Sequence, residues 1–222
     1  MKVISRKVLY FIGGANGSGK STLVTELFGA SPNIKSINAD HIASEKKCGQ
    51  TSTKVGRVVL KEIADALSAQ ESFIYETTLS AKFDGRLINR VKAAGYSIEF
   101  FYVTVSNPDY NVKRVAARKE NGGHNVRLDD ILRRRKKSLY HFYPVCAQVN
   151  HWHLYDNTED DAPHKLIAEG HTQKSGEQQV KVFKPELYAH FIQYQSVEVA
   201  DYLAEERARI AHRAKTQNLQ SK

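Results

Sequence analysis

Gly14-Ala15-Asn16-Gly17-Ser18-Gly19-Lys20-Ser21 is the stretch that decides the fold of this chain. It matches the pattern G-x-x-x-x-G-K-[ST], whose glycines let the backbone turn its N–H groups inward around phosphate oxygens. In this pattern the lysine reaches the β and γ phosphates of a nucleotide, and the following hydroxyl ligates Mg²⁺. We therefore predict that these residues and Thr22 bind ATP, with Lys20 acting in catalysis and Ser21 holding Mg²⁺.

The sequence on both sides of this loop has the context that a phosphate-binding loop requires. Residues 7–12 are rich in β-forming side chains and predict a buried strand, which Gly13-Gly14 ends. From Lys20 the pattern becomes helical, with Leu23 and Leu27 one turn apart, and Gly29 ends the segment. The positive end of this helix would face the same phosphate groups.

A dinucleotide-binding loop is the alternative interpretation. The spacing Gly13-x-x-x-Gly17-x-Gly19 is similar to the glycine fingerprint of short-chain dehydrogenases, and Asp40 lies about where an acidic ribose-binding residue is expected. A nicotinamide site, however, has no use for Lys20-Ser21-Thr22. Those dehydrogenases also normally carry Tyr-x-x-x-Lys, and no tyrosine of this chain has a lysine four positions later. We therefore favour the kinase-type loop.

Beyond the loop, strand-like and helix-like segments alternate. We predict further strands over residues 34–37, 72–75, 98–105 and 149–155. We predict helices over residues 55–67 and 83–91, after Asn107-Pro108-Asp109, and from about residue 128 to 142. This alternation predicts an α/β fold of the P-loop kinase type, a parallel sheet with helices on both faces.

The character of the chain changes after residue 158. Residues 165–168 and 179–183 predict a short hairpin with its turn between Gly170 and Gly176. A final helix would place Val199, Leu203 and Ile210 on one stripe and then fray into a polar tail. We therefore expect a kinase core over residues 1–158, with a lid at about 118–138, and a small C-terminal extension over 159–222.

Several blocks of this chain, taken together and in order, resemble the zeta-toxin family of P-loop kinases. The blocks are residues 13–23, Ile37-Asn38-Ala39-Asp40, Tyr75-Glu76-Thr77-Thr78-Leu79-Ser80, residues 114–138 and Tyr155-Asp156-Asn157-Thr158. The resemblance covers roughly residues 8–168. It implies an ATP- and Mg²⁺-dependent kinase, and the toxin members of the family phosphorylate a UDP-linked amino sugar.

Asp40 follows a short predicted strand, so it should project from the carboxyl edge of the sheet, where α/β proteins bind ligands. The resemblance implies that Asp40 is the base for the acceptor hydroxyl. Phosphoryl transfer depends mainly on alignment and charge neutralisation, and a carboxylate bound to the hydroxyl serves both. Asp40 also stands before a helical-looking segment, and capping that helix is the structural alternative.

Glu76 ends an apolar strand and is placed like a Walker B carboxylate that holds Mg²⁺ through water. The resemblance implies instead that Glu76 and Thr78 contact the acceptor, and the sequence leaves both roles open for Glu76. Toxin members tend to have an arginine where this chain has Ser80. That difference weakens the transfer of their substrate to this chain, because an arginine fork for a diphosphate would be missing.

The predicted lid carries arginines on both sides of Gly122-Gly123-His124. Glycines between helices predict a hinge, and guanidinium groups can neutralise a transferring phosphate. We expect Arg118 and Arg134 to act in catalysis, with Arg133 as the alternative to Arg134, against a merely solvated basic helix face. Asn157 follows the last core strand and is expected at the adenine end of the site, with a turn-forming asparagine as the alternative.

The composition is ordinary for a soluble chain of 222 residues, with 41% hydrophobic and 26% charged residues. The longest apolar stretch is far too short for a membrane span, and the N-terminus lacks a secretory pattern. Two cysteines, Cys48 and Cys146, lie far apart without metal-ligand spacing, as expected in a reducing compartment. We expect a cytoplasmic protein that does not use a membrane.

The formal net charge of +9 suits an anionic partner. The preferred partner is a small-molecule acceptor, because the basic run Arg133-Arg134-Arg135-Lys136-Lys137 has no aromatic stacking pattern for nucleic acid. A polynucleotide 5′-kinase remains the alternative enzyme. A nucleotide-dependent toxin or switch module that acts through a protein partner is the alternative of another class. The resemblance also implies an antitoxin-like protein that blocks the ATP site.

Overall fold

The computed structural model describes residues 6–29, 33–39, 41–42, 52–81, 85–120, 126–173 and 175–220. Asp40, Cys48, residue 83 at the start of a predicted helix, and the hinge Gly122-Gly123-His124 lie outside the described residues. Everything below concerns the described part of the chain.

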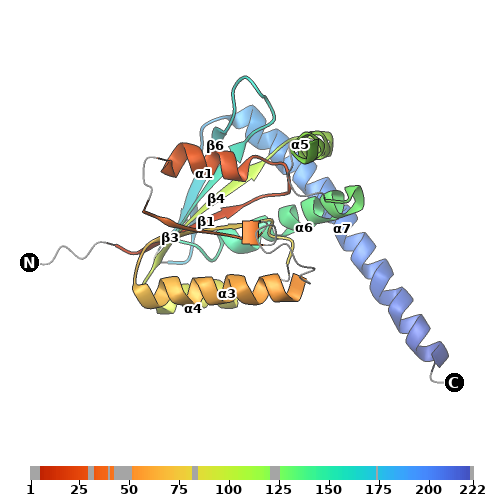
Figure 1. The fold of residues 1–222 in the computed structure, drawn as a ribbon. Helices are drawn as coiled ribbons and strands as arrows, with labels where there is room; N and C mark the ends of the chain where they lie inside the picture. Colours follow the sequence, from red (N-terminus) through yellow and green to blue (C-terminus); the bar gives the residue numbers. More distant parts are fainter. Residues whose placement is uncertain are drawn as a thin grey trace, which may run out of the picture.

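Within these residues, seven strands form one sheet in the order β2-β3-β1-β4-β5-β6-β7 (Figure 1). Their bounds are β1 Val8–Gly13, β2 Lys35–Asn38, β3 Phe73–Thr77, β4 Ser97–Thr104, β5 His151–Asp156, β6 Lys165–Thr172 and β7 Gln178–Val182. The first five strands in this order pair in parallel, and β6 and β7 are added in antiparallel fashion. The carboxyl ends of the parallel strands therefore meet at one edge of the sheet.

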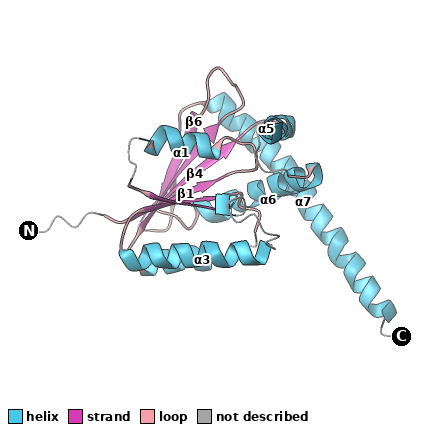
Figure 2. Ribbon diagram, in the orientation of Figure 1, coloured by secondary structure: helices cyan, strands magenta, loops and turns pink. Residues whose placement is uncertain are grey.

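Helices cover both faces of the sheet, with α1 on one side and α3 on the other (Figure 2). Their bounds are α1 Lys20–Phe28, α3 Ser52–Ala69, α4 Arg86–Ala93, α5 Pro108–Glu120, α6 Leu128–Cys146 and α7 Pro185–Gln220. The predicted α/β fold of the P-loop kinase type is thus confirmed. The helices α5 and α6 flank the predicted lid hinge.

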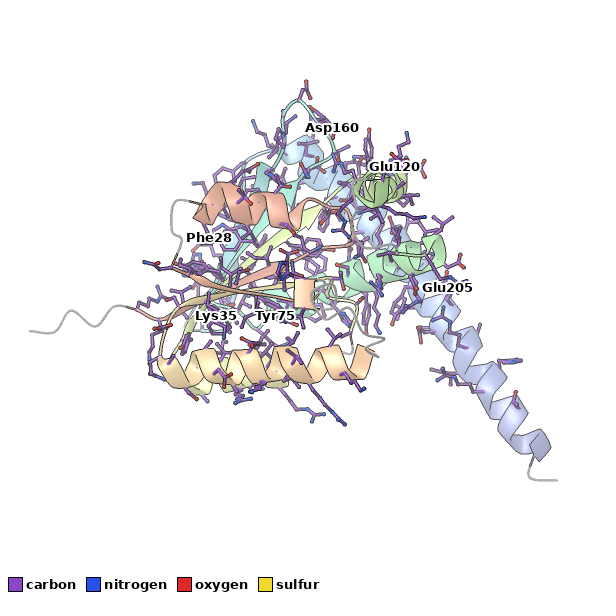
Figure 3. All side chains as sticks on the ribbon, in the orientation of Figure 1. Phe28, Lys35, Tyr75, Glu120, Asp160 and Glu205 are labelled. Carbon is purple, nitrogen blue, oxygen red and sulfur yellow. The ribbon has the colours of Figure 1, made fainter. Side chains whose placement is uncertain are left out.

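The side chains divide between the two faces as the strand period requires. Phe28 of α1 packs on Tyr10, with ring centroids 4.7 Å apart, whereas Tyr75 stacks on Phe11 on the α3 side (Figure 3). The larger core lies on the α3 side. It also includes Phe142 of α6 and Phe191 of α7, whose rings meet edge to face at 5.2 Å. The last helix therefore shares the core of the sheet.

The predicted hairpin forms as β6 and β7, and its β6 pairs with β5, so it extends the central sheet. The prediction for the last helix needs correction. Val199 packs against the core, but Ile210 is 65% exposed, so the buried stripe ends before it. The expected frayed tail is also helical to Gln220, since it consists mostly of good helix formers and carries the pair Glu206–Arg209. The division of the chain at residue 158 stays a prediction.

No helix in the described part of the chain is both long and apolar enough to cross a membrane.

Candidate active site

The phosphate loop connects β1, which ends at Gly13, to α1, which begins at Lys20. Gly17 has a φ of 73°, in the left-handed region that favours glycine. A Cβ atom at this position would lie only 2.6 Å from the backbone oxygen of Asn111 on α5. A side chain at position 17 would therefore strain the loop or force it and α5 apart.

The loop gathers polar groups that suit a phosphate. The buried Lys20 donates from its Nζ atom to the carbonyl oxygen of Ala15 at 3.0 Å. Among the buried side-chain nitrogen and oxygen atoms of the described residues, Asn16 Nδ2 and Ser18 Oγ are the ones without a hydrogen-bond partner. Buried donors without partners cost free energy, and phosphate oxygens are acceptors that would satisfy them. The loop therefore fits the triphosphate of a nucleotide.

Ser21 and Glu76, the two residues predicted to hold a metal ion, are in direct contact. The Ser21 hydroxyl donates to the Glu76 carboxylate, with distances of 2.9 and 3.1 Å to its two oxygens. Glu76 lies near the carboxyl end of β3, opposite Ile12 of β1 and Asn38 of β2, and is 6% exposed. Hydroxyl and carboxylate oxygens are the ligands that Mg²⁺ prefers, so the pair fits this ion.

A cavity of about 440 Å³ opens over the loop. It is lined by Asn16, Gly17 and Gly19 of the loop, the first turn of α1, Glu76, Arg114, Val115 and Arg118 of α5, and Asn157, Asp160, Pro163 and His164 after β5. Volumes of this order are usual for nucleotide-sized ligands. Most of the predicted phosphate-binding residues thus meet Glu76, Arg118 and Asn157 in one place, whereas Gly14, Ala15 and Ser18 are not among the lining residues.

The arginines of the predicted lid take different positions. Arg118 lines the cavity, and the Arg134 guanidinium reaches the side-chain oxygen of Asn16 at 3.4 Å. Arg133 instead pairs with Asp130, one turn earlier on α6, at 2.6 Å. This contact holds the pKa of the Asp130 carboxyl below its usual range. The two arginines expected to act in catalysis are therefore the ones near the loop.

Asn157 is tied to the loop across the sheet edge. Its Nδ2 atom donates to the carbonyl oxygen of Ser18 at 2.8 Å, and its backbone N–H donates to Thr104 at 2.8 Å. Its own carbonyl accepts from Arg114, which also pairs with Asp160. Asn157 therefore lines the cavity and holds the loop, while its contact with adenine stays a prediction.

Thr78 and Ser80 flank a backbone turn next to the predicted metal pair. Their hydroxyl oxygens are 2.8 Å apart, and Leu79 between them has a φ of 52°, which is rare for a branched residue. The buried His141 of α6 donates from Nδ1 to the Leu79 carbonyl at 2.6 Å. Burial lowers the pKa of His141 and favours its neutral form. Thr78 is not among the described residues that line the cavity.

The sequence analysis missed one residue that contacts the loop, His164, and one that lies a layer further away, Arg135. His164 contacts the Gly19 carbonyl at 3.0 Å through Nε2 and Glu26 at 2.8 Å through Nδ1, and no pattern in the sequence indicates it. Arg135 is almost fully buried on α6. Its position could have been found from the helical period, since it shares a face with Ile131, Leu139 and Phe142.

Comparisons with known proteins are consistent with this geometry. The family model described as Zeta toxin matches residues 2–148. An uncharacterized protein of Haemophilus influenzae is 30% identical over 139 residues, which are 60% of this chain and 94% of that protein.

Two solved structures share the fold at low sequence identity. A chain of the AvrRxo1-ORF1:-ORF2 structure with ATP is 15% identical, with a TM-score of 0.66, over 85% of this chain and 64% of that chain. A chain of the PezAT chromosomal toxin-antitoxin system of Streptococcus pneumoniae is 15% identical, with a TM-score of 0.57, over 91% of this chain and 89% of that chain. The present chain thus spans somewhat less than two thirds of the AvrRxo1 chain.

Proposed function

This chain belongs to the zeta-toxin family and is an ATP-dependent kinase, and we propose that it moves the γ-phosphate of ATP onto a hydroxyl of a small acceptor. The observation that carries the proposal is the contact between Ser21 and Glu76, which both line the phosphate-loop cavity. A phosphate-binding loop alone is found in many kinds of nucleotide-binding protein and would not indicate a kinase. A carboxylate paired with the loop hydroxyl adds the ligand set of a magnesium-dependent phosphoryl transfer.

Binding of ATP would rest on the loop and three cationic side chains. The backbone N–H groups and Lys20 would surround the β and γ phosphates, and Arg118 and Arg134 would neutralise the charge on the transferred group. Asn16 Nδ2 and Ser18 Oγ, which lack partners within the described residues, would gain acceptors. The cavity between α5 and the segment after β5 would hold the nucleoside.

Ser21 and Glu76 would hold Mg²⁺, which neutralises phosphate charge and orients the triphosphate when bound. Glu76 lies near the carboxyl end of β3, beside the carboxyl end of β2. The acceptor would therefore approach from the carboxyl ends of these two strands. This position is compatible with both roles predicted for Glu76, holding the metal and contacting the acceptor.

In the transfer itself, the acceptor hydroxyl oxygen forms a bond to the γ-phosphorus, and the bond to the bridging oxygen of ADP breaks. The hydroxyl proton passes to a carboxylate, and we propose Asp40 for this role from its place in the sequence. ADP leaves with the bridging oxygen and its electron pair. Each bond formed is matched by one broken.

For the acceptor we propose a nucleotide sugar such as a UDP-linked amino sugar, or another sugar or nucleotide. The resemblance of residues 75–80 to the toxin members supports a nucleotide sugar. Ser80, which stands where those members tend to have arginine, contacts Thr78 and offers no bidentate donor to a diphosphate. We therefore expect weaker selection for the UDP group than an arginine would provide.

The test is to incubate the protein with labelled ATP, Mg²⁺ and a panel of UDP-sugars, free sugars, nucleosides and 5′-hydroxyl oligonucleotides. A labelled small molecule supports the proposal. Label only on oligonucleotides, with strong salt dependence, would indicate a polynucleotide kinase. ATP binding without any labelled product would indicate a module that acts through a protein partner. Product formation by Asp40→Asn at the rate of the exposed control Asp65→Asn would exclude Asp40 as the base.

We also propose a protein partner of the antitoxin kind. The PezAT structure comes from a chromosomal toxin-antitoxin system, and its fold matches most of this chain. The measurement is growth of a bacterial host that expresses this chain, alone and together with the product of the neighbouring reading frame. Growth arrest that the neighbouring product relieves would support the proposal, and normal growth in both cultures would contradict it.

A further inference from the structure

Arg135 of α6 is a charged side chain that is 2% exposed, and residues of α7 hold it in place. Its Nε atom donates to both oxygens of Glu198, at 2.8 and 3.0 Å. The guanidinium carbon lies 5.4 Å from the centre of the Tyr194 ring, in a cation–π arrangement. A buried charge is stable only when it is paired and hydrogen-bonded, so the position of Arg135 depends on α7.

The same guanidinium determines how Asn111 of α5 is oriented. One Nη atom of Arg135 donates to Asn111 Oδ1 at 2.9 Å and to the carbonyl oxygen of Val105 at 2.8 Å. Because guanidinium has only donors, the atom of the Asn111 amide that faces it must be the oxygen. The amide nitrogen then points the other way. Arg135 therefore selects one of the two amide orientations.

In that orientation Asn111 holds the phosphate loop. Its Nδ2 atom donates to the carbonyl oxygen of Asn16 at 2.7 Å, and both residues are buried. Its backbone also touches the loop, since a Cβ atom on Gly17 would meet the Asn111 oxygen. The reversed amide would place an oxygen against the Asn16 carbonyl and repel it.

From these contacts we propose that α7 positions the phosphate loop, through Glu198, Arg135 and Asn111 in series. None of these three is among the described residues that line the cavity, so each acts through the next and not on the nucleotide. Glu198 also lies beyond residues 2–148, which the family model matches. The inference rests on the proposed function, because a correctly held loop matters only if it binds ATP.

The test is a double-mutant cycle on the full-length chain, with Mg²⁺-ATP affinity measured by calorimetry. Glu198→Gln keeps the shape and an acceptor but removes the charge, and it is expected to weaken ATP binding about tenfold. Asn111→Ala removes the contact with Asn16 directly. In the double variant Glu198→Gln should add little further loss, since the link to the loop is already broken.

A neighbouring ion pair provides the matched control. Lys136, the next residue of α6, pairs with Glu205 of α7 at 2.8 Å on the solvent side. Glu205→Gln therefore removes a contact between α6 and α7 without touching the series to the loop. Its ATP affinity should equal that of the wild type.

Hydrogen exchange in the nucleotide-free protein gives a second readout that does not depend on ATP. The amides of residues 14–19 should exchange faster in Glu198→Gln and at the normal rate in Glu205→Gln. If Glu198→Gln does not fold, Glu198→Asp keeps the charge and withdraws the carboxylate by one methylene, and the same cycle is measured with it.

The outcomes separate the two proposals. A wild-type protein that binds no ATP would refute the proposed function, while exchange would still test the series. Normal ATP binding with additive losses in the cycle, or equal losses in Glu198→Gln and Glu205→Gln, would overturn the positioning role of α7 alone.

Discussion

The sharpest prediction concerns Gly17→Ala. The new methyl group would lie 2.6 Å from the backbone oxygen of Asn111, and a carbonyl inside α5 cannot rotate away as a side chain can. The alanine would also keep a φ of 73°, which costs an L-residue about 1–2 kcal/mol. Forced overpacking adds about 1–3 kcal/mol. We expect a total loss of about 2–5 kcal/mol in unfolding free energy, or a smaller loss if the loop moves.

Alanine substitutions at two other glycines separate the backbone cost of Gly17→Ala from its packing cost. Gly95 has a φ of 81° but open space where its Cβ would lie, so Gly95→Ala should cost only the backbone share of about 1–2 kcal/mol. Gly56 lies within α3 and also has open space, so Gly56→Ala should stabilise the protein by about 0.5–1 kcal/mol. The difference between Gly17→Ala and Gly95→Ala then measures the contact with α5.

The assay combines urea unfolding without nucleotide and calorimetry with Mg²⁺-ATP. Gly17→Ala should unfold at a lower urea concentration than Gly95→Ala, or bind ATP at least about tenfold more weakly if the loop has moved to relieve the contact. Gly95→Ala should bind ATP normally, since Gly95 lies in the turn before β4. If Gly17→Ala matched Gly95→Ala in urea and the wild type in ATP affinity, the close packing of the loop on α5 would be refuted.

Three further predictions follow from other parts of the structure. Glu76→Gln should raise the Mg²⁺ concentration needed for half-maximal kinase activity by about 10- to 100-fold, measured in a magnesium titration, and leave magnesium-free nucleotide binding unchanged. Burial lowers the pKa of His141 in the folded chain from its ordinary value of 6.5. As the pH falls below 6.5, the unfolded chain therefore takes up a proton at this residue before the folded chain does. Stability should therefore fall more between pH 7.5 and 5.5 in the wild type than in His141→Gln, and equal losses in urea unfolding would contradict this assignment. Gly170→Ala would push a methyl group into the buried ring of Trp152 on the paired strand, and should cost about 1–3 kcal/mol in urea unfolding without changing ATP affinity.

The local sequence pattern was sufficient to predict the phosphate loop and most of the fold. The residues from Gly14 to Ser21 form a phosphate loop because their own backbone requirements, with a strand before and a helix after, determine its shape. The alternation of strand and helix likewise predicts a parallel sheet, because only crossover helices can join parallel strands. The pairing of Ser21 with Glu76 follows from that topology, since β3 lies beside β1.

Contacts between distant segments could not be predicted in this way. Asn157 meets Ser18 across 139 positions of sequence, and its amide serves the loop, although a turn-forming role was equally compatible with its sequence neighbours. His164 reaches Gly19 in the same manner. Such pairs depend on which strand ends become neighbours in the sheet, and local sequence propensities do not determine that arrangement.

The sequence by itself was enough to predict a site for a nucleoside triphosphate at the end of the first strand, because backbone geometry within eight residues defines a phosphate loop. Only the tertiary structure decided which of the adjacent arginines serves it and how. Arg133, Arg134 and Arg135 carry the same charge, yet one pairs along its own helix, one reaches the loop and one is buried against α7. The physical reason is that Arg135 is buried against α7 once this helix packs on α6, whereas Arg133 stays partly exposed beside Asp130 of its own helix.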